Sequence, residues 1–508
     1  METIPALLEA LRNMFQPTVF LAVLGGTIIS LIMGVIPVVS GALMVIIFLP
    51  FLFGADPIVA MPFLCALLAA SGVGGAVTSV LTGIPGDNNN APTAIDGFAM
   101  TRKGQAGRAL GLALGAGILA ALLGVGISIL IIPLMAPILM SFKTVEMFLI
   151  IVMALLFLSV LTQGSRIKGL FSAVVGLTLA CIGFQESSAI QRLTFGNLYL
   201  YDGIEMSTVL MGVLAVPTLV ELAAEGLPIA PLGAVAAGKL SELLKGMKEL
   251  FTKHLWVWFR GTVIGYAVGI APALGSATAV WIAYAQAKQG SKKPEEFGQG
   301  SPEAIVASEG ARGVCNPGDL LTTLVFGIPG CSIMVVLLAA FLMMGVVPGP
   351  TLVLDHTALS FQMILTMALS VILGAAICFA TAPLLVKITQ VPPEYLFAVL
   401  MPLIILGAYV TREYSLDIVV VGLISILGLC IKRFGFSAPA TILGFVMGRL
   451  FETYLVRSLD LRGPLFFLSS PIAIVLTALI VLSVVWGPVK SLLGRMRGGK
   501  PAMAGGAK

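Results

Sequence analysis

Long apolar segments follow one another along almost the whole chain, with short polar stretches between them. Runs such as residues 113–140 and 471–486 are apolar on every side, whereas the strands of a membrane β-barrel alternate polar and apolar residues. The segments must therefore be helices, and a helix needs about 20 apolar residues to cross a bilayer. We predict an all-α polytopic membrane protein with roughly 10 to 14 hydrophobic segments, re-entrant or broken helices among them.

The apolar segments form two series separated by a mixed region. The first series is expected near residues 17–37, 40–54, 58–82, 108–136, 145–163, 168–184 and 206–223, and the second near 256–286, 318–346, 359–390, 394–411, 415–431, 437–453 and 466–488. Leucines and charges at helical spacing after Lys239 predict an amphipathic helix along the membrane interface. We therefore divide the chain into a first membrane repeat (1–223), an interfacial linker (224–255), a second membrane repeat (256–490) and a basic, flexible cytoplasmic tail (491–508).

Two short motifs occur once in each series, in the same order. Residues 26–37 share five identities with residues 261–272 at an offset of 235, and residues 78–86 share five with residues 322–330 at an offset of 244. Chance similarity between apolar segments would not readily place glycine and proline in register twice, so we predict an internal duplication, which is frequent in secondary transporters. Seven predicted spans separate the matching points, which favours inverted repeats. One re-entrant segment would change that count and make the repeats parallel.

Each repeat contains a break with the sequence Gly-Ile-Pro-Gly, at residues 83–86 and 327–330. Proline removes a backbone donor and glycine admits a positive φ, so each break can end one half-helix and start another. Such a break is costly inside a membrane unless it faces protein or a water-filled cavity. Helix N-termini that point at one spot form an anion site, so we expect the substrate there.

Polar side chains lie close to both breaks. Residues 87–90, after the first break, are either ligand groups or a solvated loop that caps the next helix. Near the second break, Arg312 is either the partner of an anionic substrate or the neutralising partner of Glu309 or Asp319 in a structural pair near the surface. The residues predicted to bind substrate are Gly83, Pro85, Gly86, Asn88, Asn89, Asn90, Thr93, Arg312, Thr322, Thr323, Gly327, Pro329, Gly330 and Ser332, and those predicted to bind a coupling ion are Asp87, Asp96 and Glu309.

Composition and charge narrow the class of protein. Of 508 residues, 58% are hydrophobic and 10% charged, with a mean hydropathy of +1.07. The six cysteines are scattered and the two histidines, His254 and His356, lie in loop-like sequence where we expect them to be solvated, so we predict no metal site apart from bound Na⁺, no catalytic residues and no cofactor. The segment before residue 17 does not resemble a signal peptide. The positive-inside rule, applied to basic loops and the basic tail, places the C-terminus in the cytoplasm.

The motifs together resemble the large membrane subunit of the tripartite tricarboxylate transporter family (TctA-type), over roughly residues 17–460. The residues that carry the resemblance are the two Gly-Ile-Pro-Gly breaks, residues 94–111, Arg260-Gly, 297–300, Glu309 and 348–350. The resemblance implies a multi-pass carrier of the bacterial inner membrane that receives carboxylates from a periplasmic solute-binding protein. It further implies a small four-helix membrane subunit as a partner and an ion gradient, Na⁺ or H⁺, as the energy source. The absence of a Walker loop agrees with a mechanism that does not use ATP.

The chain departs from the family pattern at the predicted site. Residues 87–90 replace small residues, the paired asparagines expected after Glu309 are replaced around Arg312, and the Pro-Gly pairs of the early spans are Pro37-Val38 and Pro272-Ala273. The family's substrate is therefore not carried over beyond its class. We expect secondary active transport of a carboxylate, with no nucleic acid involved. A channel and, less favoured, an intramembrane enzyme are the alternatives.

Overall fold

The computed structural model describes residues 3–36, 40–160, 166–185, 190–225, 240–272, 274–388 and 392–496. The helices of the first part are α1 (Thr3–Met14), α2 (Pro17–Gly34), α3 (Gly41–Phe48), α4 (Pro57–Thr82), α5 (Ala91–Arg102), α6 (Ala106–Leu139), α7 (Thr144–Val160), α8 (Arg166–Ala180), α9 (Met206–Leu210) and α10 (Val216–Glu225). A π-helical turn (Met211–Ala215) joins α9 to α10, and two short antiparallel strands, β1 (Gly183–Phe184) and β2 (Gln191–Arg192), follow α8.

The second part is also helical. Its elements are α11 (Leu240–Glu249), α12 (Leu255–Gly269), α13 (Gly275–Gly290), α14 (Pro302–Phe326), α15 (Ser332–Met343), α16 (Pro350–Asp355), α17 (Thr357–Ile388), α18 (Pro393–Val410), α19 (Leu416–Arg433), α20 (Ala438–Arg462) and α21 (Pro471–Met496). Within the described residues, five helices are long and apolar enough to cross a membrane, and several shorter apolar helices accompany them. The prediction of an all-α polytopic membrane protein is confirmed.

Two predicted spans have different bounds in the structure. The segment 256–286 is two helices, α12 and α13, and the expected span 318–346 is replaced by α14, a break and α15. Helix α14 starts at Pro302, in a segment whose polar residues prevented its prediction as a membrane span from hydropathy. The segment can be buried because the charges of Glu309 and Arg312 are paired inside the protein. The predicted amphipathic helix is present as α11, whose Gly246 packs against the backbone of α6.

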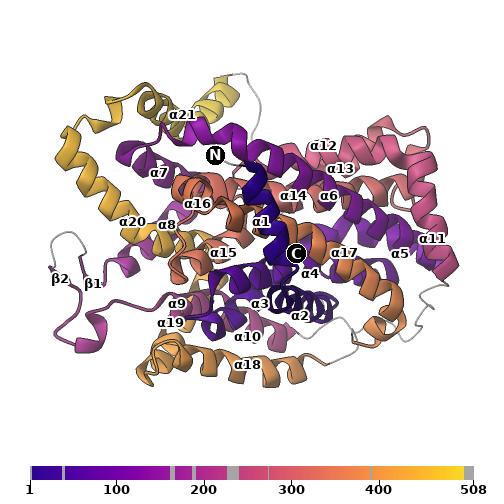
Figure 1. The fold of residues 1–508 in the computed structure, drawn as a ribbon, viewed down its shortest axis with the longest axis horizontal. Coiled ribbons are helices and arrows are strands. Elements are labelled where there is room, and N and C mark those ends of the chain that lie inside the picture. Colours follow the sequence, from indigo (N-terminus) through magenta and orange to yellow (C-terminus); the bar gives the residue numbers. More distant parts are fainter. Residues whose placement is uncertain are drawn as a thin grey trace.

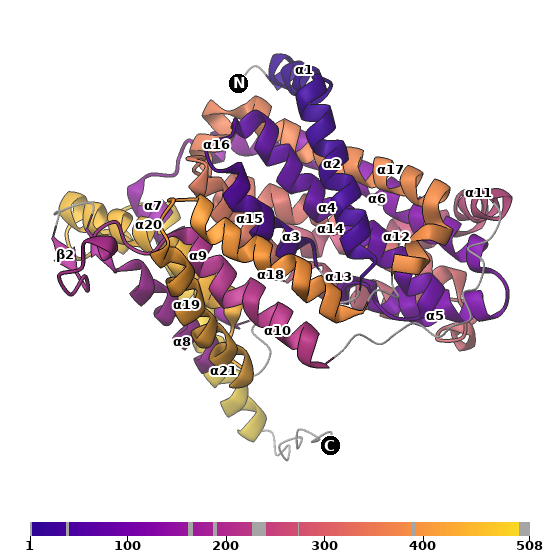
Figure 2. The same ribbon diagram turned by 90° about the horizontal axis from the view of Figure 1, so that it is seen from below.

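Helices α4 and α14 form the centre of the molecule. The apolar window of α4 is 83% buried, against 33% for that of α6. In Figures 1 and 2, α5, α11 and α12 lie on one side of this centre, and α7, α8, α19 and α20 lie on the other. The centre of the molecule therefore consists of the two helices that end at the Gly-Ile-Pro-Gly breaks.

The two faces of the protein are marked by the ends of α6, which at 1.5 Å per residue is about 51 Å long. At its start, Arg108 pairs with Glu249 of α11, with 2.6 Å between Nε and Oε2; we call this the basic face. Beyond its end, Met147 contacts Gly349; we call this the opposite face. Because that length exceeds the roughly 30 Å hydrocarbon core, α6 is long enough to place its two ends on different sides of a bilayer.

Two helical pairs enter the protein from different faces. Helix α2 follows α1 on the opposite face, and α3 leads back to the start of α4 there, where Gln362 of α17 donates to the Ile58 carbonyl. Helix α12 starts beside His254 on the basic face, and α13 returns to that face, where Gly290 lies against Arg260. The pair α2–α3 therefore packs beside α4 with an orientation opposite to that of α12–α13 beside α14.

Backbone contacts of the same kind join each pair to its central helix. A Cβ atom on Gly34 would lie 2.5 Å from the Ser71 carbonyl oxygen, and one on Gly269 would lie 2.7 Å from that of Cys315. In the predicted duplication, Gly34 matches Gly269 at an offset of 235, and Ser71 matches Cys315 at an offset of 244. Only glycine permits this approach of two helix backbones. The duplication itself stays a prediction, with which these contacts are compatible.

His254 departs from the expectation of a solvated loop histidine. It ends a π-helical turn (Leu250–His254) that leads into α12, its side chain is 13% exposed, and Nε2 lies 3.5 Å from Glu249 Oε1. Burial lowers the pKa of His254, and the nearby Glu249 opposes this shift. The neutral imidazole is therefore favoured in the folded protein. His356, in contrast, is exposed at the end of α16, as predicted.

The His254 environment predicts a loss of stability in mild acid. A histidine whose folded pKa is lowered stabilises the protein above its ordinary pKa of about 6.5 and loses that contribution as the pH falls. The midpoint of thermal unfolding in detergent should therefore fall between about pH 7.5 and about pH 5.5, and by less in His254→Gln. The Glu249 contribution is lost nearer pH 4.5, below this range. An equal fall of the unfolding midpoint in the wild type and in His254→Gln would contradict a contribution of His254 to this pH dependence.

Helix packing on the other side of the molecule gives a second prediction. A Cβ atom on Gly444 of α20 would overlap the Ala173 carbonyl of α8, whereas one on Gly422 of α19 would meet nothing within 4 Å. Gly444→Ala should destabilise the protein by about 1–3 kcal/mol because the helices must separate. Gly422→Ala is the matched control and should leave the unfolding midpoint unchanged. The midpoints can be compared by fluorescence-detected size-exclusion chromatography after heating.

Candidate functional site

Both Gly-Ile-Pro-Gly breaks begin with a glycine in the left-handed conformation. Gly83 ends α4 with φ +75°, and Gly327 ends α14 with φ +66°. Their N–H groups donate to the Ser79 and Thr323 carbonyls at 3.1 and 3.0 Å, so each helix is properly terminated. Residues with a Cβ rarely adopt this conformation, and glycine is the usual residue at such a helix end.

The last glycine of each break lies against the helix that has just ended. A Cβ atom on Gly86 would lie 2.5 Å from Gly75 Cα, and one on Gly330 would lie 2.6 Å from Asp319 Cα. The chain therefore folds back onto its own helix at both breaks. The Gly330 N–H, expected to be free for a ligand, points at Thr323 Oγ1 at 3.3 Å.

A buried polar cluster connects the first break to α14. Glu309 Oε1 accepts from Asn90 Nδ2 at 3.0 Å and from Thr93 Oγ1 at 2.7 Å, and Arg312 Nε donates to Glu309 Oε2 at 2.7 Å. Asn90, Thr93 and Glu309 are fully buried and Arg312 is 3% exposed. We call these four residues the Glu309 cluster. It brings together three residues predicted to bind substrate, Asn90, Thr93 and Arg312, and one predicted ion ligand, Glu309.

Arg312 extends from Glu309 toward two glycines. A Cβ on Gly72 of α4 would overlap Nη1, and one on Gly117 of α6 would lie 3.2 Å from Nη2. Within the described chain, neither terminal nitrogen makes a hydrogen bond to protein. Arg312 therefore neutralises Glu309 through Nε, and the same side chain also lines a cavity beside the cluster. The pairing with Glu309 is one of the two alternatives stated from the sequence, but the expected place near the surface is wrong, because Arg312 is buried.

A small cavity lies between the two breaks, next to the Glu309 cluster. Its volume is about 20 Å³. Its polar lining consists of Ser71, Asp87, Asn89, Arg312, Asn316 and the thiol of Cys331. This volume holds about one water molecule and no carboxylate solute. The protein is therefore in a closed conformation at this point.

Several residues predicted from the sequence lie away from this cavity. Thr322 and Thr323 donate to backbone carbonyls, of Ile270 and Asp319 respectively, and stabilise the helix ends. Ser332 is the first residue of α15 and is exposed, so its neighbour Cys331 takes the cavity position instead. Pro85 and Pro329 shape the breaks without lining the cavity, and the Asn88 side chain lies outside the described part.

Asp96 has a different environment from the one predicted for an ion ligand. Its Oδ1 accepts from the backbone N–H groups of Gly298, Gly300 and Ser301 at 2.8–2.9 Å, and Oδ2 accepts from the Tyr284 hydroxyl at 3.0 Å. The carboxylate thus holds the loop from which α14 starts, on the basic face. Asp96 is not among the residues that line the small cavity next to the Glu309 cluster.

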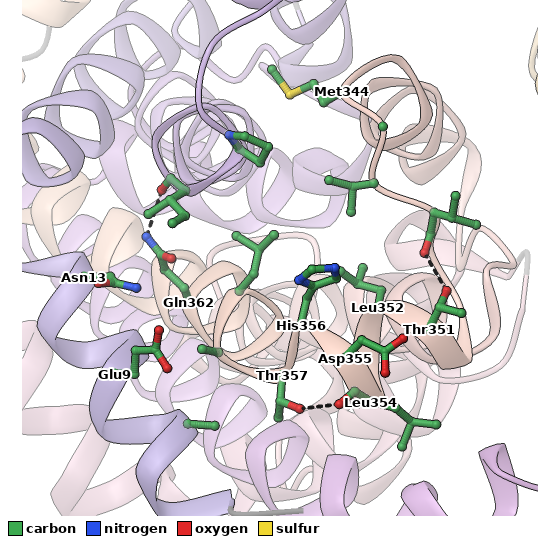
Figure 3. A pocket seen from close by; sticks show the side chains of 18 of the residues that line it. Glu9, Asn13, Met344, Thr351, Leu352, Leu354, Asp355, His356, Thr357 and Gln362 are labelled. Carbon is green, nitrogen blue, oxygen red and sulfur yellow. Dashed lines mark hydrogen bonds between the residues drawn. The ribbon is translucent and has the colours of Figure 1, made fainter.

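A larger cavity opens on the opposite face. Its volume is about 990 Å³. Figure 3 shows Glu9 and Asn13 of α1 on one side of it, and Asp355 and His356 at the junction of α16 and α17 on the other. Asp56 adds a third carboxylate to this lining. The lining is therefore acidic, which suits an approach by cations better than binding of a carboxylate.

Sequence reasoning missed the small residues that make room for the cluster. Gly72 accommodates Arg312, and a Cβ atom on Gly75 would lie 2.5 Å from Asn90 Oδ1. The signal was present, because Ser71-Gly-Val-Gly-Gly75 is a dense run of small residues inside an apolar helix. Asn316 and Cys331 also line the cavity and were not among the predicted site residues.

Comparisons with known proteins identify the family of the chain. The family described as "Tripartite tricarboxylate transporter TctA family" matches residues 20–443, which confirms the resemblance stated from the motifs. An uncharacterized 52.8 kDa protein in the TAR-I ttuC' 3' region of Agrobacterium vitis is 30% identical over 468 residues, 92% of this chain and 91% of that protein. An uncharacterized protein in the TAR-II ttuC' 3' region of the same organism is 29% identical over 230 residues, 45% of this chain and 95% of that protein. No solved structure matches the chain.

The Glu309 cluster leads to a prediction about the thermal stability of two single variants and the corresponding double variant. Glu309→Gln or Arg312→Met alone leaves one buried charge without its partner and should cost about 3–5 kcal/mol. The double variant leaves no unpaired charge in this pair and should be more stable than either single variant. Thermal unfolding in detergent measures the three values.

Glu296→Gln is the control for this series, because it removes the exposed Lys293–Glu296 pair of 2.8 Å and should change the unfolding midpoint little. Additive losses in the double Glu309/Arg312 variant would show that the two charges do not stabilise each other.

Proposed function

The chain belongs to the tripartite tricarboxylate transporter TctA family, and from this membership we propose that it is the large transmembrane subunit of a binding-protein-dependent transporter. In this proposal it carries a carboxylate solute across the bacterial inner membrane by secondary active transport. A gradient of Na⁺ or H⁺ supplies the energy. Its partners are a periplasmic solute-binding protein and a small four-helix membrane subunit.

The Glu309 cluster is the observation that carries this proposal. A guanidinium group with two donors turned toward a cavity is a natural partner for a carboxylate, because it can form two parallel hydrogen bonds. Asn89 and Asn316 add amide groups to the same cavity. The first repeat thus supplies Asp87 and Asn89, and the second supplies Arg312 and Asn316.

The closed cavity and the two oppositely oriented helical pairs support alternating access. The cavity of about 20 Å³ must enlarge before it can hold a solute. Gly41 at the start of α3 lines the cavity, and Gly275 at the start of α13 lies against Cys331, another lining residue. Displacement of one pair at a time would open the site to one side of the membrane only, which is the requirement for a carrier with inverted repeats.

The distribution of charge supports an orientation. Lys103, Arg108 and Lys253 gather on the basic face, together with Glu249. By the positive-inside rule this face is cytoplasmic, and the acidic cavity then opens to the periplasm. Helix α21 starts near Glu146, whose Oε1 accepts from Ser470, so its far end and the C-terminal tail are cytoplasmic in this proposal.

Uptake into proteoliposomes tests the proposal. The protein is reconstituted with its small subunit and binding protein, and labelled citrate, tartrate, malate and succinate serve as solutes. We expect saturable uptake of at least one of them that requires the binding protein and an imposed Na⁺ or pH gradient. Uptake that needs ATP, or flux without saturation and without the binding protein, would contradict a secondary carrier.

Substitutions at the breaks give a sharper version of this test. Gly86→Val and Gly330→Val should abolish uptake, because a Cβ atom at either position would lie within 2.6 Å of an atom of the preceding helix. Gly126→Val on α6 is the control, since a Cβ there would meet nothing within 4 Å. Membrane levels and chromatographic profiles establish that each variant is assembled. Undiminished uptake by both break variants would remove the breaks from the mechanism.

A further inference from the structure

Asp319 is a fully buried carboxyl group that the proposed substrate site does not use. It lies in α14, two turns before the second break. Its Oδ1 has no hydrogen-bond partner among the described residues, and Oδ2 accepts from the Cys315 thiol, 3.8 Å away. Cys331, just after the break, also faces this carboxyl group.

No basic side chain forms an ion pair with Asp319 in the described part of the chain. Arg312, two turns earlier on the same helix, pairs with Glu309 and extends toward Gly72. The titratable groups that face Asp319 are the two thiols, one from α14 and one from the segment before α15. Helices α12 and α13, which pack on this part of α14, approach through Gly269 and Gly275.

An ionised carboxylate in such a place would be unstable, because it has neither a cation nor a set of donors to replace water. The neutral acid avoids this cost, since its proton removes the charge. Metal binding is a weaker explanation, because a hard cation such as Na⁺ prefers several oxygen ligands to thiols. Among the described residues, no group of three His, Cys, Asp or Glu side chains could hold a metal ion.

The position of Asp319 connects its protonation to the second break. Gly330 lies against the Asp319 backbone, with a hypothetical Cβ 2.8 Å from its carbonyl oxygen. Gly275, at the start of α13, covers the neighbouring Cys331, with 3.1 Å between the corresponding Cβ positions. At the matching position of the first repeat, 244 residues earlier, the chain has Gly75. The corresponding position of the first break therefore carries no ionisable group.

We propose that Asp319 is the proton-binding site that couples transport to a pH gradient, an inference that rests on the proposed carrier function. The closed conformation holds the protonated acid. Displacement of α12–α13 from α14 admits water to Oδ1, and the proton leaves to that water. The carboxylate takes up a proton from water when the site is open to the other face, so the only bond formed or broken is O–H.

Two measurements on the complete reconstituted transporter test this assignment. The first follows the accumulation of labelled solute, and the internal pH by an entrapped dye, with a pH gradient or a Na⁺ gradient imposed. The second records the infrared carbonyl band of protonated carboxylic acids in the purified full-length chain at neutral pH, without any solute. The variants are Asp319→Asn, which mimics the neutral acid, and Asp319→Glu, which can still bind a proton.

Asp417→Asn is the matched control. Asp417 is also a fully buried carboxyl group, but it accepts from the Tyr199 hydroxyl and lies far in sequence from either break. We expect Asp319→Asn to lose the pH-driven part of accumulation and the accompanying proton movement while it still exchanges labelled for unlabelled solute. Asp319→Glu should retain part of the coupling, and Asp417→Asn should retain all of it. The infrared band should be weaker in Asp319→Asn than in the wild type.

The outcomes separate this inference from the proposed function. Accumulation by Asp319→Asn that still responds to the pH gradient, or wild-type accumulation that responds to Na⁺ alone, would overturn the role of Asp319 and leave the carrier function intact. Absence of any gradient-driven accumulation in the wild type would overturn both. An unchanged carbonyl band in Asp319→Asn would show that Asp319 is ionised, which also overturns the inference.

Discussion

The ion pair between Glu309 and Arg312 is the constraint on which the centre of this protein depends. Two opposite charges are removed from water in the middle of an apolar bundle, so each needs the other as its partner. Arg312 satisfies one carboxylate oxygen of Glu309, and Asn90 and Thr93 satisfy the other. The ligands of Glu309 thus come from both halves of the chain, which fixes the first break against α14. Loss of any of them would leave a polar group unpaired where no water can replace it.

Glycine provides the space that this cluster requires. The guanidinium group of Arg312 fits between helices only because Gly72 and Gly117 have no side chains. The same property lets Gly34 and Gly269 bring their helices into backbone contact with α4 and α14. A high glycine content in a membrane protein of this kind therefore reflects close packing around polar groups more than flexibility.

The breaks and the general fold could be predicted from the sequence because they depend on local chemistry. Proline and glycine at residues 83–86 and 327–330 determine where a helix must end, whatever surrounds it. The partners of Glu309 could not be predicted in the same way, since Asn90 and Thr93 are more than 200 residues away in sequence. The bounds of α14 were predicted wrongly from hydropathy, because a hydropathy scale gives a charged residue the same value whether its charge is paired or exposed. Ser332 was chosen instead of Cys331 because the sequence does not reveal which side of α15 faces inward.

Helix α5 is bonded to both central helices. Thr101 near its end donates to the Val80 carbonyl of α4, and Asp96 in its middle holds the loop from which α14 starts. With the Glu309 cluster added, α4, α5 and α14 are connected at several levels along their length. A conformational change that preserves these bonds moves both breaks together, as one rigid body. The substrate would then travel with its binding groups relative to the surrounding helices, and the two breaks would not separate around it.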